Sequence, residues 1–250
     1  MSSIVLLPIA GLPSVHPGQD LGRLLGDAIE AARYGLKEGD VLVVCQKIVS
    51  KAEGRVVKLA QVEPSQKALE FARTYEKDPA MVELALREAT EVLRMGNGHL
   101  ITATGKGFVS ANSGIDRSNQ AHDGEVTLLP LDADRSADEL RTRLLERFGV
   151  SIAVVVTDTF GRPWRLGQID FAIGASGLAV LDDHLGRTDW SGRGLEHTLI
   201  AVADQLAAAA GLVMGKAAGI PAVLIRGYPY QAGDGSAGDL VRPRGEDLFR

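Results

Sequence analysis

The fold is decided by one stretch, Val154-Val155-Val156-Thr157-Asp158-Thr159-Phe160-Gly161-Arg162-Pro163-Trp164-Arg165. The β-branched residues from Ile152 to Val156 predict a buried strand. This strand should end at Thr157, because Gly161 and Pro163 interrupt any continuation. The stretch therefore predicts a core strand that carries a polar loop at its end.

The polar half of the stretch offers metal ligands and anion-binding groups. Asp158 lies between two threonine hydroxyls, and hard oxygen ligands of this kind suit Mg²⁺ or Mn²⁺. Arg162 and Arg165 follow closely, so groups that bind anions stand beside the candidate metal site. An Asx turn followed by two surface arginines explains the same residues equally well. The stretch alone favours neither interpretation.

Composition places the chain among ordinary globular proteins. It has 250 residues, of which 45% are hydrophobic and 24% charged, and its formal net charge is −5. The length is ample for a sizeable core, and no block of Lys and Arg favours a nucleic-acid or membrane partner. The single cysteine, Cys45, allows no internal disulfide and suits a reducing compartment. Without a signal-peptide pattern or a long apolar run, we expect a cytoplasmic protein.

Hydrophobic spacing predicts strands and helices that do not alternate regularly. The expected strands are Ile4–Ile9, Val41–Cys45, Val56–Leu59, Val126–Leu131 and Pro221–Ile225, with a hairpin of Leu100–Ala103 and Gly107–Ser110. The expected helices are Leu21–Tyr34, two within Pro64–Arg94 of which the second is Pro79–Leu93, one capped by Ser136 and ending near Phe148, and Leu195–Met214. Loops are expected at Gln46–Gly54 and Asp182–Arg193, and Gln231–Arg250 is expected to need a partner or ligand for order.

Nucleotide-binding folds with a glycine-rich signature are not favoured. No Gly-x-Gly-x-x-Gly follows the first strand, and the P-loop motif is absent from the sequence. No linker-like composition marks a boundary either, so we expect a single domain over residues 1–250.

A second carboxylate is a candidate partner for Asp158. Asp116 lies in the polar, glycine-containing loop Gly114–Asn119. If both loops open on one cleft, the two carboxylates could hold one or two divalent ions that bridge phosphate oxygens. The alternative is that Asp116 merely closes a turn.

Basic and glycine-rich segments could complete a phosphate site. Lys47 and Lys51 follow a buried strand and could neutralise phosphate charge, or they could be exposed lysines that protect an edge strand. The first loop, with Gly11, can bring backbone groups close to a base or ribose. Gly215–Gly219 follows a predicted helix end, where carbonyl groups suit a cation or a base edge.

Five segments together resemble the coenzyme F420-0:gamma-glutamyl ligase family. They occur in the family's order and extend over nearly the whole chain: Gly11-Leu12-Pro13, Gln46–Gly54, Ala111–Asn119, Asp158–Arg165 with Gly167-Gln168, and Leu212–Lys216. Each segment alone is weak, but the set is specific. Some members continue into a flavin-binding, reductase-like domain, whereas this sequence resembles the ligase part alone.

The resemblance implies a GTP-dependent amide ligase that adds L-glutamate to the deazaflavin precursor F420-0. GTP would phosphorylate the precursor's terminal carboxylate, and the glutamate amine would attack the acyl phosphate. A gamma-linked amide would form, and further rounds would extend a polyglutamate tail. The implied fold is an α+β arrangement of mixed sheets with helices in two interleaved regions, assembled as an intertwined homodimer.

The resemblance also implies roles for individual residues. The divalent-metal ligands would be Asp116, Asp158 and Thr159, with Mg²⁺ or Mn²⁺ as the metal and K⁺ as an additional candidate. The GTP contacts would be Leu12, Pro13, Ser14, Val15, Gln46, Lys51, Asn119, Met214, Gly215 and Lys216. We hypothesise that Arg162 and Arg165 act in catalysis by holding the anionic precursor or the transferring phosphoryl group. This chain has Lys216 where many members carry an acidic residue, and Cys45-Gln46 where others often have hydroxyl residues.

Three other functions use the same residues. A ligase of the same fold could join a different amino acid or acceptor, with changes confined to the loops Asp182–Arg193 and Gln231–Arg250. A non-catalytic protein could bind GTP without turnover. A metal-dependent phosphohydrolase could release phosphate without forming an amide.

Overall fold

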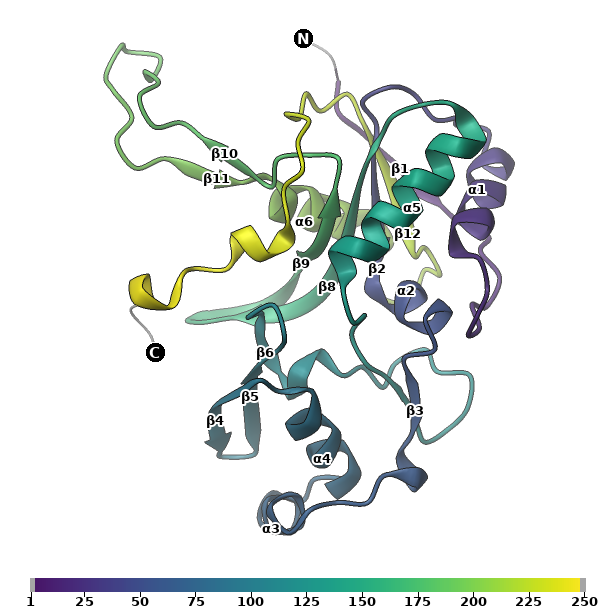
Figure 1. Ribbon diagram of the computed structural model, residues 1–250, viewed down its shortest axis with the longest axis vertical. Coiled ribbons are helices and arrows are strands. Elements are labelled where there is room, and N and C mark those ends of the chain that lie inside the picture. The colour runs from purple at the N-terminus through teal and green to yellow at the C-terminus, as the bar shows by residue number, and fades with distance from the viewer. Residues whose placement is uncertain (1–2, 248–250) are drawn as a thin grey trace.

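A five-stranded mixed sheet forms the centre of the computed structural model, which describes residues 3–247 (Figure 1). Its strands, in spatial order, are β1 (Val5–Ile9), β12 (Ala222–Arg226), β2 (Val41–Cys45), β8 (Ala153–Arg162) and β9 (Arg165–Ser176). Only β2 and β8 run parallel, and the other neighbouring strands pair antiparallel. The predicted α+β class with mixed sheets is confirmed.

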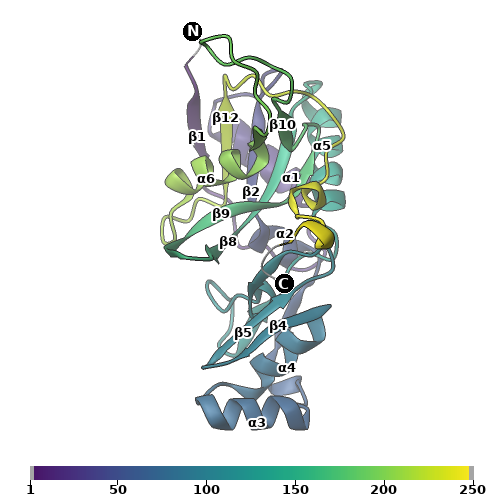
Figure 2. The same ribbon diagram turned by 90° about the vertical axis from the view of Figure 1, so that its left-hand side faces the viewer.

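Helices cover both faces of this sheet. Helices α1 (Leu21–Ala31) and α5 (Ala133–Phe148) lie on one face, and α6 (Val202–Met214) lies on the other (Figures 1 and 2). Val154 and Val156 are buried on the first face, and Val155 is buried on the second. A strand covered on both faces is apolar at every position, which explains the continuous run that the sequence shows here.

Close approach of α5 to the sheet depends on one glycine of β9. A Cβ atom added at Gly174 would lie 2.2 Å from the backbone oxygen of Ala133, closer than any real contact. The glycine therefore lets the first turn of α5 rest directly on the sheet.

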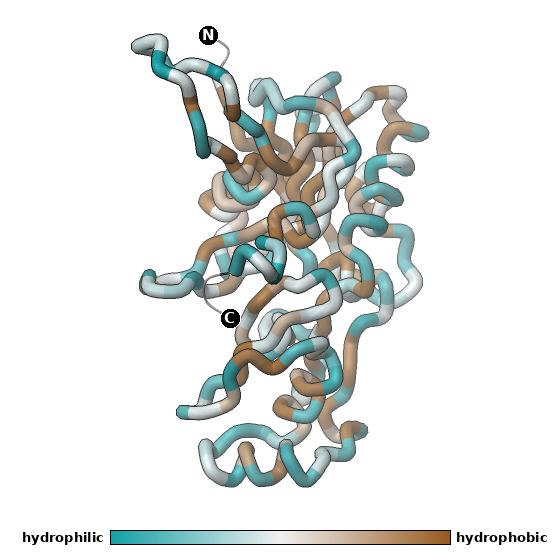
Figure 3. Tube along the Cα trace, turned by 60° about the vertical axis from the view of Figure 1, so that its left-hand side comes forward, coloured by the Kyte–Doolittle hydropathy of each residue, from teal (hydrophilic) through white to brown (hydrophobic). Residues whose placement is uncertain are grey.

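The chain between α2 (Gln46–Ala52) and α5 forms a second body beside the first. It contains helices α3 (Gln66–Tyr75) and α4 (Pro79–Glu88), a three-stranded sheet of β4 (Glu91–Gly96), β5 (His99–Ala103) and β6 (Val109–Ala111), and the pair β3 (Val56–Lys58) and β7 (Glu125–Thr127). Two small cores hold it together, and Figure 3 shows their apolar segments apart from the larger core above. This body is inserted within the sequence of the first.

The last part of the chain folds back on the first body. Strands β10 (Leu181–Asp183) and β11 (Leu199–Ala201) pair at the base of a hairpin that projects from the molecule in Figure 1. Short 3-10 turns occur at Leu59–Gln61, Asn112–Gly114, Ala237–Leu240 and Arg244–Glu246. None of the helices in residues 3–247 is long and apolar enough to cross a bilayer.

The expectation that Gln231–Arg250 needs a partner or ligand for order was wrong for its described part. Asp134, at the start of α5, accepts hydrogen bonds from the Ala237 backbone nitrogen at 2.9 Å and from Ser236 Oγ at 2.5 Å. These bonds hold the segment against its own chain, while residues 248–250 lie outside the described residues.

The predicted end of the central strand was also wrong. Strand β8 does not stop at Thr157 but continues to Arg162 and turns back into β9, with Arg162 paired to Arg165. Pro163 and Trp164 form the turn of this hairpin, where Trp164 adopts a left-handed φ of 58°. A break in the register at Gly161 and Arg162 absorbs the irregularity. The residues taken as strand breakers therefore close a hairpin.

Helix predictions failed mainly at the ends of elements. The expected loop Gln46–Gly54 contains helix α2, and the expected helix Pro79–Leu93 ends at Glu88, after which β4 begins. Helix α5 is capped by Asp132, whose side chain accepts from Arg135 N, and not by Ser136. Other bounds differ as well. For example, α1 ends at Ala31 and β7 ends at Thr127, and α6 begins at Val202 because Leu199–Ala201 pairs with β10. The hairpin of β5 and β6 is confirmed.

Candidate active site

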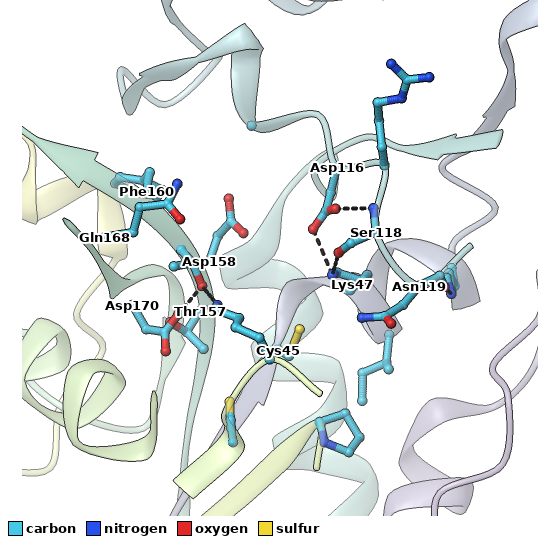
Figure 4. A pocket seen from close by; sticks show the side chains of 18 of the residues that line it. Cys45, Lys47, Asp116, Ser118, Asn119, Thr157, Asp158, Phe160, Gln168 and Asp170 are labelled. Atoms are coloured by element: carbon cyan, nitrogen blue, oxygen red, sulfur yellow. Dashed lines mark hydrogen bonds and ion pairs between the residues drawn. The ribbon is translucent and has the colours of Figure 1, made fainter. Parts of the chain in front are cut away.

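A cavity of about 830 Å³ lies where the two bodies meet (Figure 4). It opens at the carboxyl ends of the parallel strands β2 and β8, the end at which parallel strands commonly present ligand-binding groups. Six segments line it, and they include twelve of the predicted site residues: Leu12, Pro13, Ser14, Val15, Lys51, Asp116, Asn119, Asp158, Thr159, Met214, Gly215 and Lys216.

Unequal strand lengths open the cavity. Strand β2 ends at Cys45, which pairs with Thr157, whereas β8 continues to Arg162. Residues of β8 beyond Thr157 therefore have no β2 neighbour, and their edge borders the cavity. Side chains from both faces of β8 can reach this edge, because successive side chains of a strand point to opposite faces.

The Asp116 side of the cavity comes from the inserted body and is firmly anchored. Asp116 and Thr127 exchange two backbone hydrogen bonds of 2.9 and 2.8 Å. Upstream, buried Ser113 donates its backbone N–H to Thr102 Oγ1 at 2.9 Å and its hydroxyl to the Ala85 carbonyl at 2.7 Å. The loop that carries Asp116 is thus fixed on both sides.

Helix α2 places two lysines at the cavity, four residues apart on one helix face. Lys47 Nζ lies 2.8 Å from the Asp116 carboxylate and 2.6 Å from Ser118 Oγ, as Figure 4 shows. Lys51 Nζ donates to the Asn119 carbonyl at 2.5 Å. Burial and the nearby Lys47 charge lower the pKa of Lys51. The helix therefore joins the two bodies through its lysines.

The two carboxylates of the cavity have opposite pKa shifts. Burial alone would raise the pKa of Asp116, but hydrogen bonds from Lys47 and Ser118 hold it below its ordinary value. Burial raises the pKa of Asp158 to about 6, and the Asp116 charge adds to this rise. Asp158 thus carries a charge that the cavity does not fully compensate.

The donor set at these carboxylates fits a hard divalent cation. Asp116 and Asp158 interact electrostatically across the cavity, and a cation between them would relieve their repulsion. No group of three or more His, Cys, Asp or Glu side chains able to hold a metal occurs in residues 3–247. Two carboxylates with space for water and phosphate oxygens correspond to the way proteins usually bind Mg²⁺.

The other face of β8 carries a second polar group. Thr159 pairs with Asp170 of β9, and its hydroxyl donates a short hydrogen bond to the Asp170 carboxylate. Lys216 Nζ donates to the same hydroxyl and lies 3.6 Å from Asp170 Oδ1. Asp170 was missed by the sequence analysis. Recognition of the β8–β9 hairpin would have placed it opposite Thr159.

Three predicted site residues do not line the cavity. Gln46 is fully buried, and its Oε1 accepts a hydrogen bond from Ser50 Oγ at 2.8 Å. Its side-chain amide also favours the charged form of Asp158, which lowers the pKa of that carboxyl. Its Nε2 makes no hydrogen bond of ordinary length with another described residue. Arg162 and Arg165 lie at the turn of the β8–β9 hairpin. Neither arginine is among the residues that line the cavity.

A sequence profile described as F420-0:gamma-glutamyl ligase matches residues 11–227, which include every residue that lines the cavity. The chain belongs to this family. It is 45% identical over 250 residues to the coenzyme F420:L-glutamate ligase of Methanothermobacter thermautotrophicus, with 99% of each chain covered. The ligase of the same name from Methanopyrus kandleri is 45% identical over 258 residues, with 100% of both chains covered. That of Archaeoglobus fulgidus is 42% identical over 99% of this chain and 96% of its own.

Membership of the F420-0:gamma-glutamyl ligase family confirms the resemblance found in the sequence. The match extends over nearly the full length of this chain and of each of these relatives. Both bodies of the fold lie mostly within the matched residues, as does the β8–β9 hairpin with its arginines.

Proposed function

We propose that this cavity binds GTP and F420-0 and joins the amine of L-glutamate to a carboxylate of F420-0 through an amide bond, with gamma-glutamyl bonds formed as further glutamates are added. The observation that carries the proposal is the meeting of Asp116, Asp158, Lys47 and Lys51 at one cavity of a chain in this ligase family. Phosphoryl transfer needs positioned cations more than a covalent nucleophile. The cavity supplies that combination.

Asp116 and Asp158 are the proposed ligands of Mg²⁺ or Mn²⁺, and K⁺ is an additional candidate. The ion would supply positive charge to neutralise the phosphate oxygens. Thr159, the third predicted ligand, faces away from Asp158 along β8, so we do not assign its side chain to this ion. The raised pKa of Asp158 supports the assignment, because the folded chain leaves its charge poorly compensated.

GTP would be held by the segments that surround the two lysines. Lys51 and Lys47 would neutralise phosphate charge, while backbone groups of Leu12, Pro13, Ser14 and Val15 would approach the base or ribose. Four further predicted GTP contacts line the same cavity: Asn119, Met214, Gly215 and Lys216. Buried Gln46 would act indirectly, by favouring the charged form of Asp158.

The proposed reaction has two steps. A carboxylate oxygen of F420-0 forms a bond to the γ-phosphorus of GTP, and the bond to the GDP oxygen breaks. The glutamate nitrogen then forms the amide bond, inorganic phosphate leaves, and the nitrogen loses its surplus protons to solvent. Arg162 and Arg165 would hold the anionic precursor on the hairpin that extends from the cavity wall.

We also propose a homodimer. Several large apolar side chains are exposed on the projecting hairpins and on α6: Trp164 (79%), Leu166 (100%), Trp190 (99%) and Leu212 (84%). Exposed apolar surface of this kind is typical of an interface between subunits. Sedimentation should give twice the chain mass, and a monomer at micromolar concentration would contradict the dimer.

One assay separates this function from the three alternatives. Purified protein is incubated with GTP, Mn²⁺ or Mg²⁺, L-glutamate and F420-0, and the products are analysed by mass spectrometry. The proposal predicts a product heavier by one glutamyl unit, with GDP and phosphate formed in step. Phosphate release without amide indicates a phosphohydrolase, GTP binding without turnover indicates a sensor, and product only with another amino acid or acceptor indicates a different ligase.

A further inference from the structure

The ammonium group of Lys216 lies against two oxygen groups of the cavity wall, a hydroxyl and a carboxylate. Its Nζ donates to Thr159 Oγ1 and lies 3.6 Å from Asp170 Oδ1. A hydroxyl and a carboxylate are hard oxygen ligands, which small cations prefer. Both belong to the cavity wall, on the face of β8 opposite to Asp158.

The surroundings favour positive charge at this position. Helix α6 ends at Met214, two residues before Lys216, and the carboxyl end of a helix carries partial negative charge. Asp170 is only 12% exposed, so its carboxylate needs a nearby cation.

Gly211 fixes the Asp170 carboxylate in this position. A Cβ atom added at Gly211 would lie 2.1 Å from Asp170 Oδ2, so the carboxylate rests directly on α6. Packing against α6 therefore holds the Asp170 carboxylate in place. Its contact with Lys216 thus depends on the fold and not on a chance meeting of two flexible side chains.

We propose that Lys216 is a built-in cation that occupies the position between Thr159 and Asp170 and excludes a metal ion from it. The inference deepens the proposed function, on whose metal site at Asp116 and Asp158 it rests. A divalent ion bound to one acidic side chain has a net charge of +1, which is the charge of one lysine ammonium group. Lys216 thus gives the phosphate-binding cavity the charge of an ion without the ion.

Counting bound metal ions tests this proposal without measuring catalysis. Mn²⁺ binding to the metal-free full chain is measured by electron paramagnetic resonance for wild type, Lys216→Glu and Lys216→Arg. The Lys216 side chain is 71% exposed, so these substitutions leave the core intact. We expect Lys216→Glu to bind one Mn²⁺ more per chain than wild type, and Lys216→Arg to bind the same number.

A double variant ties the additional ion to Asp170. Lys216→Glu combined with Asp170→Asn should lose the additional Mn²⁺, because the ligand charge is removed while the shape is kept. The proposal is overturned if Lys216→Glu binds the same number of ions as wild type, or if the double variant keeps the additional ion. Failure of the Asp116–Asp158 site would instead lower the count in all four proteins and leave the difference unchanged.

Discussion

Thr159 and Asp170 lie directly opposite each other on the β8–β9 hairpin and share a hydrogen bond, whereas Asp158, the neighbour of Thr159, points to the other face of the sheet. The two faces therefore contribute separately to one cavity. This is possible because β8 continues beyond the end of β2.

Gly211→Ala tests how tightly Asp170 is held against α6. Alanine normally stabilises a helix interior by about 1 kcal/mol relative to glycine. Here the new Cβ would collide with the Asp170 carboxylate, so we expect a net loss of about 1–3 kcal/mol in the free energy of unfolding. Urea denaturation measures the change. Gly105→Ala, which meets no atom within 4 Å, is the matched control, and a more stable Gly211→Ala protein would contradict the packing.

Lys51→Met should weaken GTP binding by about tenfold, equivalent to about 1.4 kcal/mol. The variant removes the ammonium that donates to the Asn119 carbonyl at the cavity, but keeps most of the apolar stem. Isothermal titration calorimetry with GTP measures the affinity. Lys58→Met, at the exposed end of β3, should leave the affinity unchanged. An unaltered affinity in Lys51→Met would remove Lys51 from the nucleotide site.

Asp158→Asn should stabilise the metal-free protein above pH 6. The pKa of Asp158 is about 6 in the folded chain and about 3.9 when unfolded, so the ionised form is disfavoured by folding. The penalty grows as the pH rises from about 4 to 6 and reaches at most about 3 kcal/mol. Asparagine avoids it, and its advantage should vanish as the pH falls towards 4.

Chemical denaturation of both proteins in a chelator, at pH 4 and pH 8, measures this difference. Asp123→Asn, in the exposed loop before β7, serves as the control for loss of one carboxylate. An Asp158→Asn advantage that is the same at both pH values would refute the raised pKa.

Arg162→Gln should raise the KM for F420-0 by about tenfold and leave GTP affinity unchanged. We expect GTP affinity to be unaffected because Arg162 lies at the hairpin turn and does not line the cavity. Initial rates at varied F420-0 give the KM. A weaker affinity for GTP with an unchanged KM for F420-0 would place the arginine on the nucleotide instead.

The sequence predicted the core of the fold better than the edges of its elements. The strands Val41–Cys45 and Ile152–Val156 were recognisable, because burial on both faces leaves an unbroken apolar run. The β8–β9 hairpin was not, since its polar, exposed continuation lacks that signal and Pro163 suggested a break. Helix α2 is short, and its tertiary contacts through Lys47 and Lys51 compensate for its weak apolar pattern.

The candidate site was predictable only in part for a related reason. Asp116 and Asp158 stood out as carboxylates in polar segments next to apolar ones, and both line the cavity. Asp170 gave no such signal, because its proximity to Thr159 depends on strand pairing. The position of Arg162 and Arg165 outside the cavity lining follows from the same hairpin, where the sequence predicts a polar loop.

The central claim is that Asp158 holds the divalent ion on which glutamyl transfer depends. The most direct measurement is the rate of the glutamyl product formed by Asp158→Asn, read by mass spectrometry with saturating GTP, Mn²⁺, L-glutamate and F420-0. Wild type should form product heavier by one glutamyl unit, and the variant, folded by circular dichroism, should form it at least about a hundredfold more slowly. A variant rate within about threefold of wild type would contradict the account.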